Sequence, residues 1–301
     1  MKRPIPILSA MLCLAAAARA FAGTPIDQHR AVAADARIDV SNAKGAVTIS
    51  GWDRPEVAIS GTLGTGAKGL EVDGGDDHLK IKVEAPDQHG WFSWGSDAHM
   101  GDTLLDIKVP LAAELKIEVV SADVSLSGVA GRSLNVDSVS GKLHLDSGAK
   151  DVEIDSVSGN VDVAGKAERA HVETVSGDIR ARGLGGQIKF ETISGDIDAE
   201  NDRYRQIDAG TVSGDINLRG APERGARVEV ETMSGDVHLY LPADVSTRLR
   251  ASSFSGTIRS DFGAVKSEDH GPGSRLEASN GDGEGQVKVE TFSGDIEIRR
   301  Q

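Results

Sequence analysis

The sequence predicts an all-β, single-domain β-solenoid of the parallel β-helix type, with coils of about 18–21 residues, Ser-Gly-Asp corner turns and an N-terminal β cap. Three observations predict this fold. A pentapeptide of the type "VSGDI" recurs eight times, apolar and polar residues alternate around each copy, and no sustained i, i+3, i+4 apolar stripe indicates a helix. A meander of antiparallel hairpins is the main alternative, because Ser-Gly-Asp also suits a tight hairpin turn. The near-constant period favours the solenoid.

The first 22 residues have the features of a secretory signal peptide. Lys2 and Arg3 give a basic start, residues 5–18 form a short apolar run, and small residues precede Gly23, where cleavage is expected. An uncleaved membrane anchor is the alternative, and the shortness of the run argues against it. Because the only cysteine, Cys13, lies in this segment, we expect neither a disulfide nor thiol chemistry in the mature chain.

The mature chain is strongly acidic. Removal of residues 1–22 takes away three basic residues and no acid, which leaves 30 Lys and Arg against 47 Asp and Glu, a formal charge of −17. Nucleic acid requires a basic surface, and anionic headgroups repel an acidic one, so neither is an expected partner. No later segment is apolar for the roughly 18 residues that a membrane-spanning helix requires, so no span is expected after cleavage.

Residues 23–115 are expected to form irregular β strands that begin and cap the stack. They contain an aromatic loop at 87–102, "DQHGWFSWGSDAHMGD". Trp91, Phe92 and Trp94 are candidate binding residues, because exposed aromatic rings stack on sugars or insert into a protein partner. The alternative is that the loop folds back and its aromatic side chains cover the open end of the solenoid.

Residues 116–301 are expected to form roughly nine solenoid coils. The steps between successive corner glycines are 18, 18, 18, 19, 21, 21 and 38 residues. Because the last step is long enough for two coils, we interpret "LEASNGDGEG" at 276–285 as a degraded copy, and the Gly-, Pro- and charge-rich insertion 261–274 as a solvated loop. The predicted structural turn glycines are Gly141, Gly159, Gly177, Gly195, Gly214, Gly235, Gly256 and Gly294.

The alternation within a period indicates which side chains face the core. In "AHVETVSGDIRARGLGGQ" at 170–187, Val172 and Thr174 share one phase before the corner, and Ile179 and Ala181 continue it after the corner. We expect this set to point inward, and the hydrophobic residue on each side of Ser-Gly-Asp to hold the corner in the core. Glycine supplies a positive φ or a close backbone approach, and Ser and Asp hydrogen-bond nearby amides.

The repeated aspartates are candidate Ca²⁺ ligands. In-register coils would place their carboxylates about 5 Å apart, and a hard cation would relieve the repulsion between them. The alternative is that each Asp is hydrogen-bonded within its own turn; Lys142, Asn160 and Thr257 interrupt the row. The candidate metal ligands are Asp178, Asp196, Asp215, Asp236 and Asp295.

A second row consists of Ser and Thr two residues before each corner serine. A flat, exposed row of this kind could bind ice, but these residues share the inward phase, so we expect a buried hydroxyl ladder. Its members are Ser156, Thr174, Thr192, Thr211, Thr232, Ser253 and Thr291.

The chain resembles the DUF4097 family of bacterial β-strand repeat proteins, whose family name carries an adhesin label. The resemblance rests on the "SGDI"-type copies and on "VSNAKGAVTISGWDRPEVAISGTL" at 40–63, with its Gly-x-Val-x-Ile-x-Gly-Trp-Asp opening, and it covers roughly residues 36–301. It implies an exported, β-solenoid-like protein, and it offers no catalytic residues to carry over.

The sequence lacks the common catalytic motifs: it has no nucleophile elbow, no HExxH and no phosphate-binding GxxxxGK[ST]. We therefore predict a non-enzymatic protein of the cell envelope without a cofactor, an adhesin or binding scaffold whose partner is an envelope protein or a glycan. Two alternatives stay open: a periplasmic protein-interaction scaffold associated with envelope stress, and a polysaccharide-active β-helix enzyme. Periplasmic, cell-surface and secreted locations all fit, and the sequence indicates neither the oligomeric state nor the handedness.

Overall fold

The structure, a computed structural model, describes residues 23–85, 100–267 and 273–301. Within these ranges every regular element is a β strand, which confirms the all-β class. The predicted signal peptide lies outside the described residues. The strands are β1 Thr24–Ala31, β2 Arg37–Trp52, β3 Glu56–Leu63, β4 Gly69–Gly74, β5 His78–Glu84, β6 Thr103–Pro110, β7 Glu114–Val129, β8 Ser133–Ser140, β9 Leu143–Ser147, β10 Asp151–Ser158, β11 Val161–Gly165, β12 Arg169–Ser176, β13 Ile179–Arg182, β14 Gly186–Ser194, β15 Ile197–Ser213, β16 Ile216–Ser234, β17 Val237–Leu241, β18 Thr247–Ser255, β19 Ile258–Ser260, β20 Val265–Ser267, β21 Ser274–Asn280, β22 Gly285–Ser293 and β23 Ile296–Arg300.

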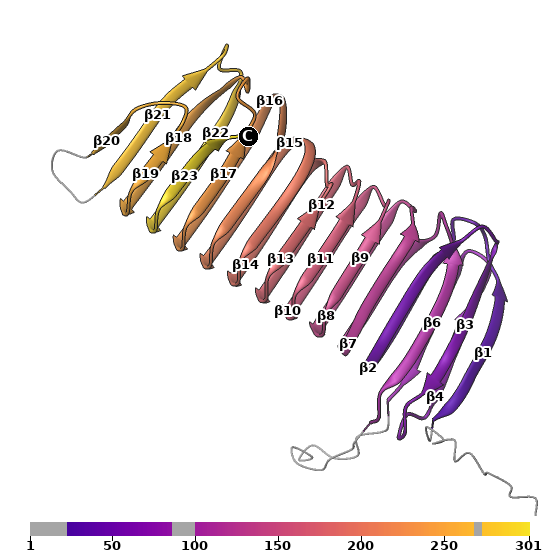
Figure 1. Ribbon diagram of the computed structural model, residues 1–301. Helices are drawn as coiled ribbons and strands as arrows, with labels where there is room; N and C mark the ends of the chain where they lie inside the picture. The colour runs from indigo at the N-terminus through magenta and orange to yellow at the C-terminus, as the bar shows by residue number, and fades with distance from the viewer. Residues whose placement is uncertain (1–22, 86–99, 268–272) are drawn as a thin grey trace, which may run out of the picture.

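Each repeat contributes one strand to each of two layers, joined at the Ser-Gly-Asp-type corner. β8, β10, β12 and β14 pair side by side in what we call the first layer, and β9, β11 and β13 pair in the second layer. All these pairs are parallel, so the hairpin meander is wrong for this part of the chain. The long strands β7, β15 and β16 run from one layer into the other, and the whole forms one 23-stranded sheet. The result is a solenoid-like stack (Figure 1).

The register between neighbouring repeats follows the sequence period. Val172 lies opposite Ile154 in the first layer, and Ile179 lies opposite Val161 in the second, each 18 residues on. Equivalent residues therefore lie in rows along the stack, with a spacing near the 4.8 Å that separates neighbouring strands. Side chains of one kind that recur at one position of the motif therefore form a continuous row along the stack.

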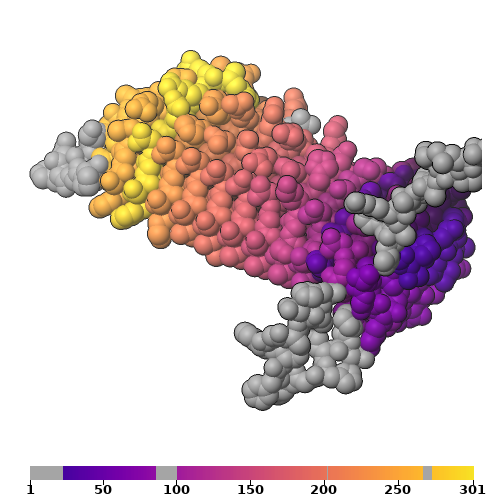
Figure 2. All heavy atoms as spheres, turned by 60° about the horizontal axis from the view of Figure 1, so that its bottom comes forward, coloured from indigo at the N-terminus to yellow at the C-terminus, as the bar shows by residue number. Residues whose placement is uncertain are grey.

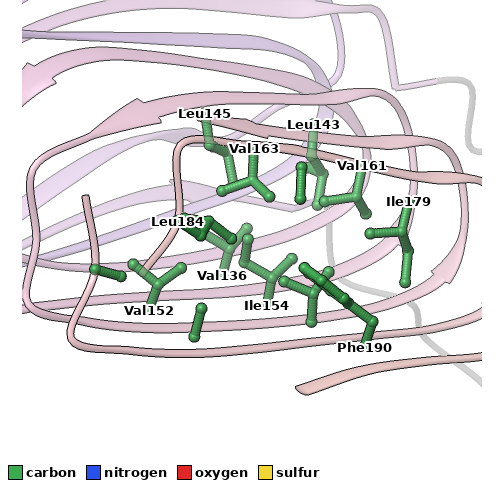
Figure 3. Close-up of a cluster of buried hydrophobic side chains, with 14 of the residues drawn as sticks. Val136, Leu143, Leu145, Val152, Ile154, Val161, Val163, Ile179, Leu184 and Phe190 are labelled. Carbon is green, nitrogen blue, oxygen red and sulfur yellow. The ribbon is translucent and has the colours of Figure 1, made fainter. Parts of the chain in front are cut away.

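The core lies between the two layers. Figure 3 shows Leu143, Leu145, Val161 and Val163 of the second layer facing Val136, Val152, Ile154 and Phe190 of the first. All are at most 4% exposed, as the inward phase of the alternation predicts. Because the sequence has a single cysteine, no disulfide can form within the chain, and this apolar filling and the interstrand hydrogen bonds stabilise the stack.

The N-terminal strands extend both layers. β2 pairs in parallel with β7 along both of its halves, like a further coil. Beyond β2, the second layer continues through β6, β3 and β1, and the β6–β3 and β3–β1 pairs are antiparallel. The first layer continues through β5 to β4, which pair antiparallel with each other.

At the C-terminal end the spatial order departs from the chain order. The last coil, β22–β23, lies between β16–β17 and β18–β19 and pairs in parallel with both (Figure 1). The prediction of a degraded coil at 276–285 is wrong: β21 pairs antiparallel with β18. The insertion 261–274 is also not only a loop, because β20 pairs with β21 and Phe262 is buried. Antiparallel pairing lets a short segment cover the edge of β18 without completing another coil.

The stack is elongated, and its coils form adjoining bands across the long axis (Figure 2). Within residues 23–85, 100–267 and 273–301, no helix has the length and apolar character needed to cross a membrane.

Candidate binding surface

The residue before each corner serine is apolar and points into solvent. We expected it to hold the corner in the core, and that expectation is wrong: these side chains are 42–59% exposed. Only the residue after the corner Asp position, such as Ile179, is buried. We call the exposed set the apolar ladder: Val120, Val139, Val157, Val175, Ile193, Val212, Met233, Phe292 and Phe254, in spatial order.

The ladder is continuous because the corner serines that follow its members pair in register. Ser176 pairs with Ser158 on one side and with Ser194 on the other, and Ser293 pairs with both Ser234 and Ser255. At the last step Phe292 and Phe254 stack with their ring centroids 4.9 Å apart and their planes 10° apart. That contact exists only because β22 lies beside β18.

A row of carboxylates runs beside the apolar ladder. Two residues before each ladder member, seven of the nine coils carry Glu or Asp, while the other two carry Gly210 and Ser252. The period-2 alternation places these residues on the same outer face of the first layer. We call this set the acidic column: Glu118, Asp137, Asp155, Glu173, Glu191, Glu231 and Glu290.

The two rows line a groove. One section, of about 1030 Å³, is lined by four ladder valines from Val120 to Val175 and by the carboxylates from Glu118 to Glu173. A second section, of about 700 Å³, is lined by Ile193, Val212, Met233 and Phe292. Glu173 lines both sections, so they adjoin.

The charge of the acidic column is balanced unevenly along the groove. Lys288 Nζ lies 2.9 Å from the Glu231 carboxylate and 2.9 Å from the Glu290 carboxylate, and these contacts raise the pKa of Lys288. Lys189 Nζ lies 2.6 Å from Glu191.

At Asp137, burial first and then the like charges of Asp155 and Glu118 raise the carboxyl pKa, against the opposing effect of Lys116. The positions beside Asp137 and Asp155, two residues earlier in each strand, are Asn135 and Glu153. Lys68 and Lys82 line the end of this section nearest Glu118, and Lys116 pairs with Glu118. Negative charge is therefore least compensated farther along the section, around Asp155 and Glu153.

The corner glycines lie where the coils approach most closely. A Cβ on Gly195 would lie 2.0 Å from the carbonyl oxygen of Gly177, and the same close approach, 1.9–2.2 Å, recurs at all eight predicted turn glycines. Some of the eight also have positive φ, such as Gly141 and Gly159, and others do not. The shared requirement at these positions is space for the neighbouring coil.

The corner aspartates hydrogen-bond between coils. The backbone N–H of Asp215 donates to Oδ1 of Asp196 at 2.8 Å, and the N–H of Asp236 donates to Oδ1 of Asp215 at 2.8 Å. Asp295 continues the chain of bonds to Thr257, and the bond from the Thr257 N–H lowers the pKa of Asp295. One oxygen of each predicted Ca²⁺ ligand, Asp178 included, is thus engaged by the backbone of the next coil. Calcium binding there stays a prediction.

The Ser and Thr row is buried, as the inward phase predicts. All seven predicted members are at most 7% exposed. Some donate to the corner glycine of the preceding coil in space, for example Ser253 Oγ to the carbonyl of Gly294 at 2.9 Å. An exposed ice-binding array is excluded by this burial.

The aromatic candidates Trp91, Phe92 and Trp94 lie outside the described residues, so both interpretations of their loop stay predictions. Among the residues that the structure describes, one further group could hold a metal: His171, Glu173 and Glu191, with ligand atoms within 4.8 Å of one another. These side chains are 36–52% exposed, and Lys189 already pairs with Glu191.

Sequence reasoning missed the apolar ladder, although the signal was present. If Val172 and Thr174 point inward, the same alternation places Val175 outward. The expectation that Val175 lies in the core rests only on its hydrophobicity and its place beside a corner, and its 42% exposure contradicts it.

Comparison with known sequences and structures connects this geometry to a family. The sequence model of the family Toastrack DUF4097 matches residues 36–239 and 206–299. No curated protein matches the chain.

Among solved structures, a protein from Parabacteroides merdae described as a "putative adhesin" is similar, with a TM-score of 0.54 and 10% identity over 93% of this chain and 97% of that one. A second protein so described, from Bacteroides fragilis, has a TM-score of 0.45 and 14% identity over 91% and 97%. The likeness to the first supports the fold alone.

Proposed function

This chain belongs to the Toastrack DUF4097 family, and from that premise we propose that it is an exported, non-enzymatic binding scaffold of the cell envelope that uses the apolar ladder as its contact surface. Adhesion, the role in the description of the Parabacteroides merdae protein, is one form that such binding takes. The basic and apolar character of residues 1–22 supports export to the periplasm or the cell surface.

The observation that carries this proposal is the exposure of the apolar ladder. Nine apolar side chains in one line, two of them phenylalanines, are 42–59% exposed. Soluble proteins rarely expose a large contiguous apolar patch, and such patches usually mark interaction sites. The fold needs an outward residue at this position but does not need an apolar one.

The architecture suits a scaffold. We infer that the antiparallel strands β1, β3 and β6 cap one end of the stack, and that β20 and β21 cover the first layer at the other end. Covered ends would prevent stacks from joining through their open strand edges, which leaves the long faces for binding.

Binding to envelope material tests the proposal. Protein purified from full-length expression would be presented to immobilised envelope proteins and to an array of glycans and cell-wall fragments. A ladder variant, Val139→Thr/Val157→Thr/Val175→Thr, keeps the β-branched shape and replaces one methyl group of each valine with a hydroxyl. We expect binding to fall markedly in this variant.

The matched control is Asp146→Asn/Asp162→Asn/Asp198→Asn, which changes outward residues of the second layer. Binding unchanged in the ladder variant but lost in this control would move the contact surface to the second layer and refute the proposal.

A further inference from the structure

We propose that the apolar ladder and the acidic column together form a docking groove for a cationic amphipathic helix, a segment of a partner protein that lies along the axis of the stack. This inference rests on the proposed function, because it names the chemistry of the partner at the same surface. It follows from the shape of the groove, the pairing of its backbone and the distribution of its charge.

The length of the ladder matches a helix. Its nine members span eight interstrand steps, which at about 4.8 Å each give roughly 38 Å. A helix with a rise of 1.5 Å per residue covers that distance in about 25 residues. Its apolar stripe repeats roughly every 5.4 Å, close to the ladder spacing, and cationic residues on one flank of the stripe would face the acidic column.

The backbone along the groove favours a helix over an added strand. At the corners, the Gly177 N–H donates to the Ser194 carbonyl at 3.1 Å, and the Gly195 N–H donates to the Ser213 carbonyl at 3.1 Å. The neighbouring coils therefore already use the groups that β-strand addition would require. A helix satisfies its own backbone hydrogen bonds and needs only side-chain contacts from the groove.

The charge of the groove selects a cationic partner. Asp137, Asp155 and Glu173 lie beside the ladder valines, and the adjoining outward positions in these strands are Asn135, Glu153 and His171. Lys68, Lys82 and Lys116 lie toward the Glu118 end of the groove, so the carboxylates around Asp155 are the ones with the least compensation. Anionic lipid headgroups would be repelled here, and Lys or Arg side chains would be attracted.

The two ends of the groove differ in a way that orients the partner. Near Phe292, Met233 and Phe254 the apolar side chains are large, and Lys288 neutralises nearby carboxylates. Near Val139 and Val157 the apolar side chains are small and the carboxylates are less compensated. A partner helix would therefore place its larger apolar residues toward β18 and its cations toward β8.

A synthetic 25-residue helical peptide of Leu and Lys at amphipathic spacing is the probe. Its binding to the purified protein would be measured by fluorescence anisotropy, beside a scrambled peptide of the same composition and a Leu/Glu peptide of the same pattern. The charge variant is Asp137→Asn/Asp155→Asn/Glu173→Gln. The ladder variant and the second-layer control variant of the binding test complete the set, and circular dichroism would verify that each variant is folded.

We expect the Leu/Lys peptide to bind and both other peptides to bind at least about tenfold more weakly. The charge variant and the ladder variant should each weaken binding about tenfold, the factor given by about 1.4 kcal/mol summed over three exposed contacts. The second-layer control should change it less than twofold, although it removes the same charge.

Equal binding of the scrambled peptide would overturn the inference, because it would show only attraction to a polycation. Self-association of the protein that the ladder variant abolishes would also overturn it, with a second copy as the occupant. If no peptide binds while the ladder variant still loses envelope binding, the inference fails and the proposed function stands. If the ladder variant keeps all envelope binding, the proposed function itself fails.

Discussion

The two sides of each corner carry similar apolar residues that meet opposite environments. Ile179, after the corner, is 0% exposed and packs between the layers, whereas Val175, before it, is 42% exposed. Packing explains the repetition of the first residue, because burial of a large aliphatic side chain stabilises the fold by about 1.5–3 kcal/mol. It does not explain the second. Similar apolar repeats in one motif can therefore serve the fold on one side and binding on the other.

The corner that separates these two sides is the most sensitive point. We expect Gly195→Ala to destabilise the protein by about 4 kcal/mol, in the range reserved for a severe steric change. The new Cβ would lie 2.0 Å from the Gly177 carbonyl oxygen, so the coils would have to separate and weaken their corner hydrogen bonds. Urea denaturation followed by circular dichroism measures the loss.

The control for this change is Gly75→Ala, where a Cβ meets no atom within 4 Å. It should shift stability by less than about 0.5 kcal/mol. If the two variants lost similar amounts of stability, the close contact between coils would not be the reason that glycine is required at the corner.

The next largest expected effect comes from replacing the residue on each side of the corner. We expect Ile179→Ala to cost about 3 kcal/mol, because it leaves a cavity between the layers, and Val175→Ala to cost less than about 1 kcal/mol, because its side chain is already half in water. Thermal and urea unfolding measure both. In the peptide-binding experiment the order should reverse, with Val175→Ala the more damaging of the two in folded protein. A large stability loss for Val175→Ala would remove the argument that this position is free for binding.

Much of the fold follows from the sequence because its signals are local and repeated. The alternation around Val172 and Ile179 predicts the core, and the step between corner glycines predicts which strands pair. The outward position of Val175 follows from the same alternation. Hydrophobicity alone does not reveal it, because roughly half of any protein surface is apolar and an apolar residue is therefore not always buried.

The order of the last coils could not be predicted in this way. Spacing gives the length of a coil, but it does not say which coil lies beside which. Ser293 forms equivalent pairs with Ser234 and with Ser255, so the repeat pattern accepts the last coil between the two as readily as after them. What distinguishes the arrangements is tertiary: the antiparallel pair β18–β21 covers the edge that a sequential coil would have used.

The smallest effect concerns the charge on the outer side of the corner. Burial, Asp155 and Glu118 raise the pKa of Asp137 in the folded protein, so the folded state holds that proton more tightly than the unfolded state does. Ionisation of Asp137 therefore lowers the free energy of unfolding as the pH rises from the unfolded pKa to the raised folded pKa. Well below both pKa values Asp137 is protonated in both states, and its pKa shift has no effect on stability. Asp137→Asn should raise Tm slightly at pH 7, by about 1 °C, and should leave it equal to the parent value near pH 2.5.

Scanning calorimetry at the two pH values, with Asp162→Asn of the second layer as the matched control, measures this difference. Removal of Lys116, which opposes the shift, should enlarge the gain from Asp137→Asn. A loss of stability at pH 7 would instead mean that the ionised Asp137 is stabilised in the folded protein. The acidic column would then lack the uncompensated charge that attracts a cationic partner, and the outer side of the corner would differ from the inner side only in its exposure.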